Sequence, residues 1–205
     1  MKQDVLTMGA IARDMLRDAV KALVDHDLRL AEDVLKKKSL IRKMDLDLEQ
    51  RALQLVALYQ PMAKDLRVIA ACLKSITYIA RIGRYGKDIA STVKDLHNES
   101  SIARDLNLEE ICESVIKMID DALTAFKEEN LIPIHDISER DDAIDVRRWS
   151  VFKKCIECMM ADKRNIQSCA YYMMVARYLE RCGDHACKIA EKVHFMVTGE
   201  PIEYK

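Results

Sequence analysis

Two pairs of acidic residues, each with members four apart, are the part of the sequence best suited to chemistry. Glu180 and Asp184 flank Gly183, and Asp141 and Asp145 form the other pair. Residues four apart lie on one face of a helix, where two like charges repel by a few tenths of a kcal/mol. A glycine inside a helix costs a further ~1 kcal/mol relative to alanine. A cation bound by the carboxylates would offset the repulsion, and a neighbouring helix packed closely against the glycine would offset the cost of that residue.

Carboxylates that face one another from adjacent helices of a bundle are the ligands of di-iron proteins. Four such groups with no required histidine suit hard cations bound through oxygen: iron(III), manganese, magnesium or calcium. We therefore predict a metal site formed by Asp141, Asp145, Glu180 and Asp184. The alternative is a solvated helix margin, where ordinary ion pairs hold the same acids. Asp184 with Lys188 and Asp145 with Arg148 would be such pairs.

The residues around these acids have simpler expected roles. His185 is directed away from the acids by about 100° in a helix and is predicted to be exposed rather than a ligand. Glu191 extends the acid line two turns further on and is a weaker candidate. The solvated face of this helix is expected to carry the basic residues Arg177, Arg181, Lys188 and Lys192.

A degraded copy of the same stretch occurs one hundred residues earlier, at residues 78–90. The tyrosine, arginine, glycine, isoleucine and alanine recur in register, but both acids are missing. The preceding helices of the two halves align with a shift of 103 residues. The first-half counterparts of Asp141, Asp145, Glu180 and Asp184 are Lys38, Arg42, Ala80 and Arg84. The first half is therefore predicted not to bind a cation, and its cationic patch is either solvated or binds an acidic partner surface or the second half of another subunit.

The repeat predicts two copies of a three-helix unit. Helical periodicity covers residues 2–25 and 28–58, and Pro61 is expected in the first turn of a third helix that runs to about Leu96. The polar segment 97–101 resembles a linker, Asn130 is expected to cap a helix, and Asp162 is expected to start the last one. The predicted fold is all-α, with six long helices in a tandem pair of antiparallel three-helix bundles. The predicted domains are residues 1–100 and 101–205.

Composition narrows the class of protein. Half of the residues are hydrophobic, and only five glycines and three prolines occur, which favours an almost entirely helical chain. The net charge of −1 gives no support to nucleic-acid binding. No apolar run reaches the roughly 20 residues of a membrane span. Seven cysteines are an odd number and argue against a disulfide framework; we expect Cys155 and Cys158 to be buried small side chains rather than zinc ligands.

Several of these stretches also carry a resemblance to a known family. The segment from Gln60 to Arg67 resembles the Q-P-x-A-x-D-L-R turn of the PhoU family of phosphate-uptake regulators. Residues 180–184 match that family's E-R-x-G-D motif, and residues 141–145 its second D-x-x-x-D motif. The opening residues 6–9 and the tandem three-helix plan are also similar, so the resemblance covers nearly the whole chain.

The resemblance implies a PhoU-like bundle that binds a metal cluster, often iron or zinc, through its acidic pairs. Manganese and magnesium remain open. It also implies a cytoplasmic negative regulator of phosphate uptake, located peripherally at the inner face of the membrane through transporter contacts. The implied partners are the ATPase of the phosphate ABC transporter and the phosphate-sensing histidine kinase. The first half departs from the family, because its acids are absent, so one metal site per chain is expected.

The favoured function is thus a regulatory protein without catalysis that acts by protein contacts, as a homo-oligomer such as a dimer. No Gly-rich phosphate loop or nucleophile–base pair can be identified. The alternative is an enzyme of phosphatase or oxidase type, in which a carboxylate-bridged metal activates water or oxygen. A third possibility is a structural adaptor that binds no metal.

Overall fold

The structure, a computed structural model, describes residues 1–96 and 105–204. Within these ranges the chain forms helices and no strands, which confirms the predicted all-α class. The long helices are α1 (Lys2–Asp25), α2 (Leu28–Tyr59), α3 (Ala63–Leu96), α4 (Leu108–Glu128), α5 (Ile137–Ala161) and α6 (Ile166–Thr198), and the short ones are η1 (Ile132–Ile134) and η2 (Lys163–Asn165). There are six long helices in these ranges, and the α4–α5 and α5–α6 connections each include a single turn of 3₁₀-helix.

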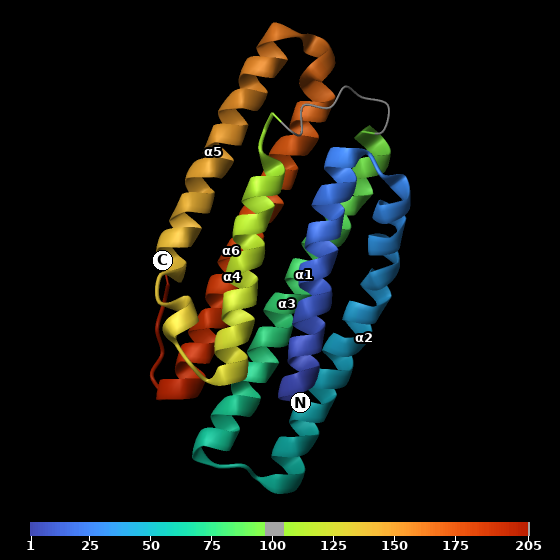
Figure 1. The fold of residues 1–205 in the computed structure, drawn as a ribbon. Coiled ribbons are helices and arrows are strands. Elements are labelled where there is room, and N and C mark those ends of the chain that lie inside the picture. The colour runs from blue at the N-terminus through green and yellow to red at the C-terminus, as the bar shows by residue number, and fades with distance from the viewer. Residues whose placement is uncertain (97–104, 205) are drawn as a thin grey trace.

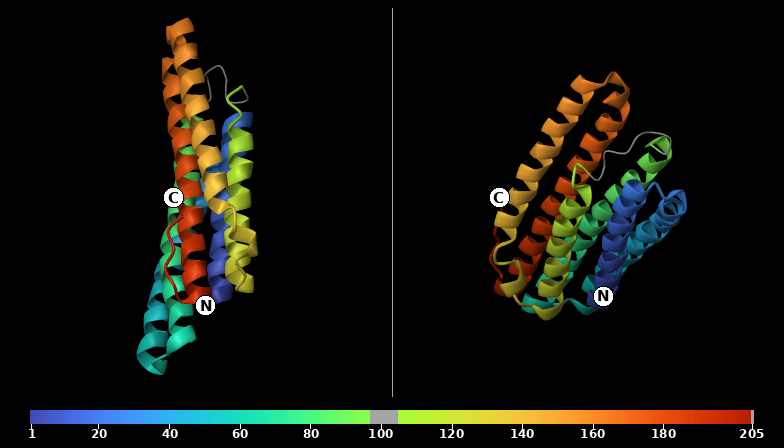
Figure 2. Two further views of the ribbon diagram at one scale, coloured as in Figure 1. Left: turned by 90° about the vertical axis from the view of Figure 1, so that its left-hand side faces the viewer. Right: turned by 45° about the horizontal axis from the view of Figure 1, so that its top comes forward.

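The helices form two antiparallel three-helix bundles, as predicted (Figure 1). Helices α1–α3 make the first bundle and α4–α6 the second, and the bundles meet where α3 packs on α6 and α1 on α4. The α2–α3 end projects beyond the other helices at one end of the molecule, and the α5–α6 end projects at the other (Figures 1 and 2). Buried side chains of both bundles join in one continuous hydrophobic core. The predicted domain boundary after residue 100 and the predicted linker 97–101 fall outside the described residues.

In helix α1 the hydrophobic periodicity of the sequence corresponds to one buried face. Its apolar side chains recur every three or four residues and are buried, among them Val5, Met8, Ala12 and Met15. The carboxylate of Asp27 then accepts hydrogen bonds from the first amides of α2 and caps that helix. No described helix is long and apolar enough to cross a membrane.

Two of the predicted helix starts are wrong and one is confirmed. Helix α3 begins at Ala63, two residues after Pro61, because the turn out of α2 requires left-handed backbone at Gln60 and Ala63. The Asn130 side chain accepts a hydrogen bond from the amide of Ile132 and so stabilises η1 instead of starting α5. Asp162 does cap the turn η2 that leads into α6.

Candidate functional site

The four predicted ligands lie on two neighbouring helices of the second bundle. Asp141 and Asp145 are on α5, and Glu180 and Asp184 are on α6, which packs along it. The close approach depends on Gly183. A Cβ atom at that position would lie 2.7 Å from Oδ1 of Asp141. The absent side chain of Gly183 therefore provides the space that the Asp141 carboxylate occupies.

Asp141 is the most perturbed of the four acids. Its Oδ1 atom is buried and has no hydrogen-bond partner. Burial, together with the negative charges of Asp184 and Asp145, raises the pKa of Asp141 to about 7. A carboxylate in this environment is one that a cation would stabilise in its ionised form.

Arginines hold the two acids on α6. Glu180 is buried and accepts hydrogen bonds from Arg177, and Nε of Arg148 on α5 lies 3.4 Å from its Oε2. Asp184 accepts a hydrogen bond of 2.7 Å from Arg181. Burial raises the pKa of Glu180, although the hydrogen bond and charge of Arg177 and the charge of Arg148 oppose that effect.

These ion pairs differ from the ones expected on a solvated margin. Arg148 pairs with Glu180 instead of Asp145, and Arg181 instead of Lys188 pairs with Asp184. Arg177 and Arg181 were expected only on the solvated face of α6, but they pair with Glu180 and Asp184 of the candidate site. Their spacing of three residues before an acid was the signal that could have revealed this pairing.

The four carboxylates are the type of ligand that a hard cation prefers, but their positions in this structure are not those of a formed metal site. The four carboxylates lie along the interface between α5 and α6, and the buried Oδ1 atom of Asp141 lacks a hydrogen-bond partner. Nevertheless, within residues 1–96 and 105–204 no three His, Cys, Asp or Glu side chains are arranged to hold one ion. A bound metal would require Glu180 and Asp184 to exchange their arginine partners for the ion.

The residues beside the acid pairs occupy different environments from those expected. The ring of His185 stacks on Tyr78 and Tyr85 of α3, with centroids 5.8 and 5.9 Å apart, so the prediction that it is exposed is wrong. Burial, together with the positive charge of Arg81, lowers the pKa of His185 to about 4. Glu191 is buried and accepts a 2.7 Å hydrogen bond from Lys188.

The predicted burial of the two α5 cysteines is confirmed for Cys155 and only in part for Cys158. All seven cysteines are free, and Cys155 is buried while Cys158 is partly buried. The thiol of Cys155 lies among apolar side chains, and burial is the main cause that raises its pKa.

The two bundles repeat the same packing at the α2–α3 and α5–α6 seams. A Cβ at Gly83 would lie 3.4 Å from Ile41, and a Cβ at Gly183 would lie 3.4 Å from Ile144. This match agrees with the shifts of 103 and 100 residues found in the sequence. The position in the first bundle that corresponds to the acid pairs is therefore occupied by Lys38, Arg42, Ala80 and Arg84, as predicted.

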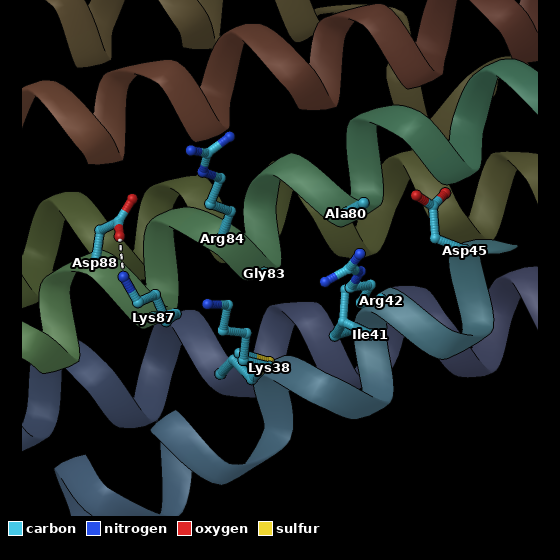
Figure 3. Close-up of a pocket in the computed structure, with 10 residues that line it drawn as sticks. Lys38, Ile41, Arg42, Asp45, Ala80, Gly83, Arg84, Lys87 and Asp88 are labelled. Carbon is cyan, nitrogen blue, oxygen red and sulfur yellow. Dashed lines mark hydrogen bonds and ion pairs between the residues drawn. The ribbon is translucent and has the colours of Figure 1, made fainter.

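That position is a cleft of about 370 Å³ between α2 and α3 (Figure 3). Ala80 leaves open the space that the Glu180 side chain occupies in the second bundle. The lining of the cleft also includes three charged residues that were not expected there: Asp45, Lys87 and Asp88. Cations therefore line the α2–α3 cleft at the positions where the α5–α6 interface carries carboxylates.

Known proteins resemble this chain along its whole length. The family model of the PhoU domain matches residues 5–93 and 108–193, one match in each bundle. The phosphate-specific transport system accessory protein PhoU homolog of Clostridium acetobutylicum is 30% identical, over 99% of this chain and 93% of the relative. The protein of the same name from Rhizobium meliloti is 34% identical, over 94% and 81% of the two chains.

Solved structures give the same result. The crystal structure of PhoU from Pseudomonas aeruginosa superposes with a TM-score of 0.90 at 30% identity, and covers 97% of this chain and 95% of that one. The phosphate transport system regulatory protein PhoU from Streptococcus pneumoniae gives a TM-score of 0.89 at 26% identity, with 98% and 95% covered.

Proposed function

The chain belongs to the PhoU domain family, and we propose that it is an accessory and regulatory protein of a phosphate-specific transport system. The observation that carries this proposal is the full-length similarity to relatives of that name, in both sequence and fold. Its place of action would be the cytoplasm, at the inner face of the membrane where a transporter presents its ATPase.

The proposed action is negative regulation through protein contacts. The partners would be the ATPase of the phosphate ABC transporter and the phosphate-sensing kinase. Large apolar side chains exposed on the outer helix α5 support this mode of action, because such surfaces are common where proteins associate. Val146, Trp149 and Met160 are 70%, 51% and 82% exposed. A homo-oligomer, such as a dimer, would use part of the same apolar surface.

A pull-down from phosphate-replete cells tests this proposal. We expect the transporter ATPase or the sensor kinase to be captured, and its amount to fall with a Trp149→Ser/Met160→Ser variant. The control is Lys153→Ser/Glu157→Ser, which changes two exposed polar residues of the same helix. Capture of neither partner by the wild-type protein would contradict the proposal. Light scattering of the same variants measures the oligomer, and a monomeric wild-type protein would contradict self-association.

A metal ion in the second bundle is the second part of the proposal. Asp141, Asp145, Glu180 and Asp184 would hold it, and the ion would link α5 to α6 and add stability that grows with the logarithm of its concentration relative to its Kd. The unpaired Oδ1 of Asp141 and the four-carboxylate donor set support this site. Iron, manganese, magnesium and zinc are the candidates.

Elemental analysis of the purified protein tests the metal. We expect bound metal in the wild type and its loss in Asp141→Asn/Glu180→Gln. The control Glu109→Gln/Glu113→Gln removes another pair of acids four apart, on the exposed face of α4. Equal metal content in all three proteins, or none in the wild type, would contradict the proposed site.

We propose no catalytic role. The named relatives are accessory and regulatory proteins, and two of the four acids are held by arginines along a helix seam. Phosphatase or oxidase turnover that is lost in Glu180→Ala and Asp184→Ala would instead support the enzymatic alternative.

A further inference from the structure

The cleft in the first bundle has the charge of an anion site. Its lining includes four cationic side chains and two carboxylates, so positive charge is in excess: Lys38, Arg42, Asp45, Arg84, Lys87 and Asp88. Lys38 and Arg42 extend from α2 toward α3, whereas Arg84 and Lys87 are carried by α3 (Figure 3). The cations therefore come from both walls.

Most of these cations have no protein partner. Lys87 lies 2.8 Å from Asp88 and is paired. In the part of the chain that the structure describes, Lys38, Arg42 and Arg84 form neither an ion pair nor a hydrogen bond. The cations at the α5–α6 interface of the second bundle differ in this respect, because Arg148, Arg177 and Arg181 each pair with a carboxylate there. Three unpaired cations around one hollow repel one another unless an anion joins them.

The size of the cleft favours a small ligand over a flat protein surface. Its volume of about 370 Å³ falls within the range of about 300–1,000 Å³ found for small-molecule sites. Ala80 and Gly83 are among its lining residues, and their small size leaves space for a ligand between the two helices. Arginine binds phosphate oxygens through paired N–H groups, and lysine adds a compact positive charge.

We infer that this cleft binds the phosphate group of a small anion, held by Lys38, Arg42 and Arg84. The free inorganic ion and a phosphate ester share this chemistry, and each has space in the cleft. The site does not depend on a metal in the second bundle, since no residue is common to the two. One chain would thus bind a cation at one seam and an oxyanion at the corresponding seam.

Isothermal titration calorimetry at constant ionic strength tests the inference. The probes are inorganic phosphate and AMP, with chloride as the reference anion. We expect one phosphate or AMP per chain, bound at least about tenfold more tightly than chloride, because a dianion gains more from three cations than a monovalent ion. Tighter binding of inorganic phosphate identifies the free ion as the ligand, and tighter binding of AMP identifies an ester.

The variant Lys38→Gln/Arg42→Gln removes two cations of the cleft. We expect it to weaken binding about tenfold or more. The control is Lys36→Gln/Lys43→Gln, which removes the same charge from exposed residues of the same helix outside the cleft. It should bind within about twofold of the wild type, because exposed charges beyond the site are screened.

Three results would overturn the inference. One is the absence of binding by either phosphate probe to the wild-type protein. Another is equal binding of phosphate and chloride, which would show a response to ionic strength alone. The third is equal weakening in both double variants. Thermal unfolding of each variant without ligand shows that it is folded, and Arg84→Gln provides an independent change on α3.

Discussion

The Oδ1 atom of Asp141 lies where a side chain at Gly183 would have to go, since a Cβ there would be 2.7 Å away. We expect Gly183→Ala to lower the free energy of unfolding by about 1–2 kcal/mol, because overpacking costs more than the ~1 kcal/mol that alanine gains in a helix. The matched variant is Gly83→Ala, whose nearest neighbour is Ile41 at 3.4 Å. It should be neutral or stabilising by up to about 1 kcal/mol. Urea unfolding measures both, and equal stability of the two variants would contradict this packing.

Gly86 on α3 allows a different close contact. A Cβ at that position would lie 3.0 Å from backbone atoms of Met15 and Leu16 on α1. Backbone in the centre of a helix cannot yield as a side chain does. Gly86→Ala should therefore be less stable than Gly83→Ala by about 2–3 kcal/mol, again measured by urea unfolding. A difference near zero would show that α1 and α3 are not in close contact here.

The sequence was a good guide wherever one helix face decides the outcome. The buried side of α1, from Val5 to Met15, follows from spacing alone. The correspondence of Gly83 with Gly183 likewise followed from the repeat, and the contacts with Ile41 and Ile144 agree with it.

Features that depend on how two helices meet could not be derived in this way. His185 looked exposed because its own helix places it outside the apolar stripe, but Tyr78 and Tyr85 of the other bundle cover it. One of the two arginine partners of Glu180 could not be predicted for the same reason, since Arg148 reaches it from α5. A helical pattern specifies which way a residue faces but not which residue of another helix it meets.

Asp141 should make stability depend on pH. Its pKa of about 7 in the folded protein exceeds the value of about 3.9 for an unfolded aspartate. The folded state binds more protons between these values, so its stability falls as the pH rises from about 4 to 7. In Asp141→Asn this contribution, about 1–2 kcal/mol after allowance for solvent screening, should be lost. Denaturant unfolding at several pH values measures it, and Glu139→Gln, an exposed acid in the first turn of α5, is the control.

His185 should act in the opposite direction. Its pKa of about 4 in the folded protein is below the value of about 6.5 for an unfolded histidine. The unfolded state binds more protons between these values, so stability is lost as the pH falls from 6.5 toward 4. His185→Phe keeps a ring between Tyr78 and Tyr85 and should remove about 1–2 kcal/mol of this loss.

The opposite signs of these two contributions make the single variants informative. In the wild type they partly cancel between about pH 4 and 6.5, so its stability should change little there. Asp141→Asn should become less stable on acidification and His185→Phe more stable, relative to the wild type. His135→Phe, which changes an exposed ring on the turn before α5, is the control for the histidine. Parallel pH profiles of Asp141→Asn and His185→Phe would contradict both assignments.

The ion pairs of Glu180 should stabilise the α5–α6 seam when no metal is present. Glu180→Ala leaves Arg148, whose side chain is 17% exposed, without its carboxylate partner. An unpaired charge at such a site is costly, so we expect a loss of about 1–3 kcal/mol in the free energy of unfolding. The double variant with Arg148→Ala should lose less stability than the sum of the two single losses, and the difference from that sum is the coupling between the two residues. Asp33→Ala, which breaks an exposed pair with Lys36, should have no measurable effect. Strictly additive losses for Glu180→Ala and Arg148→Ala would show that the two side chains do not interact.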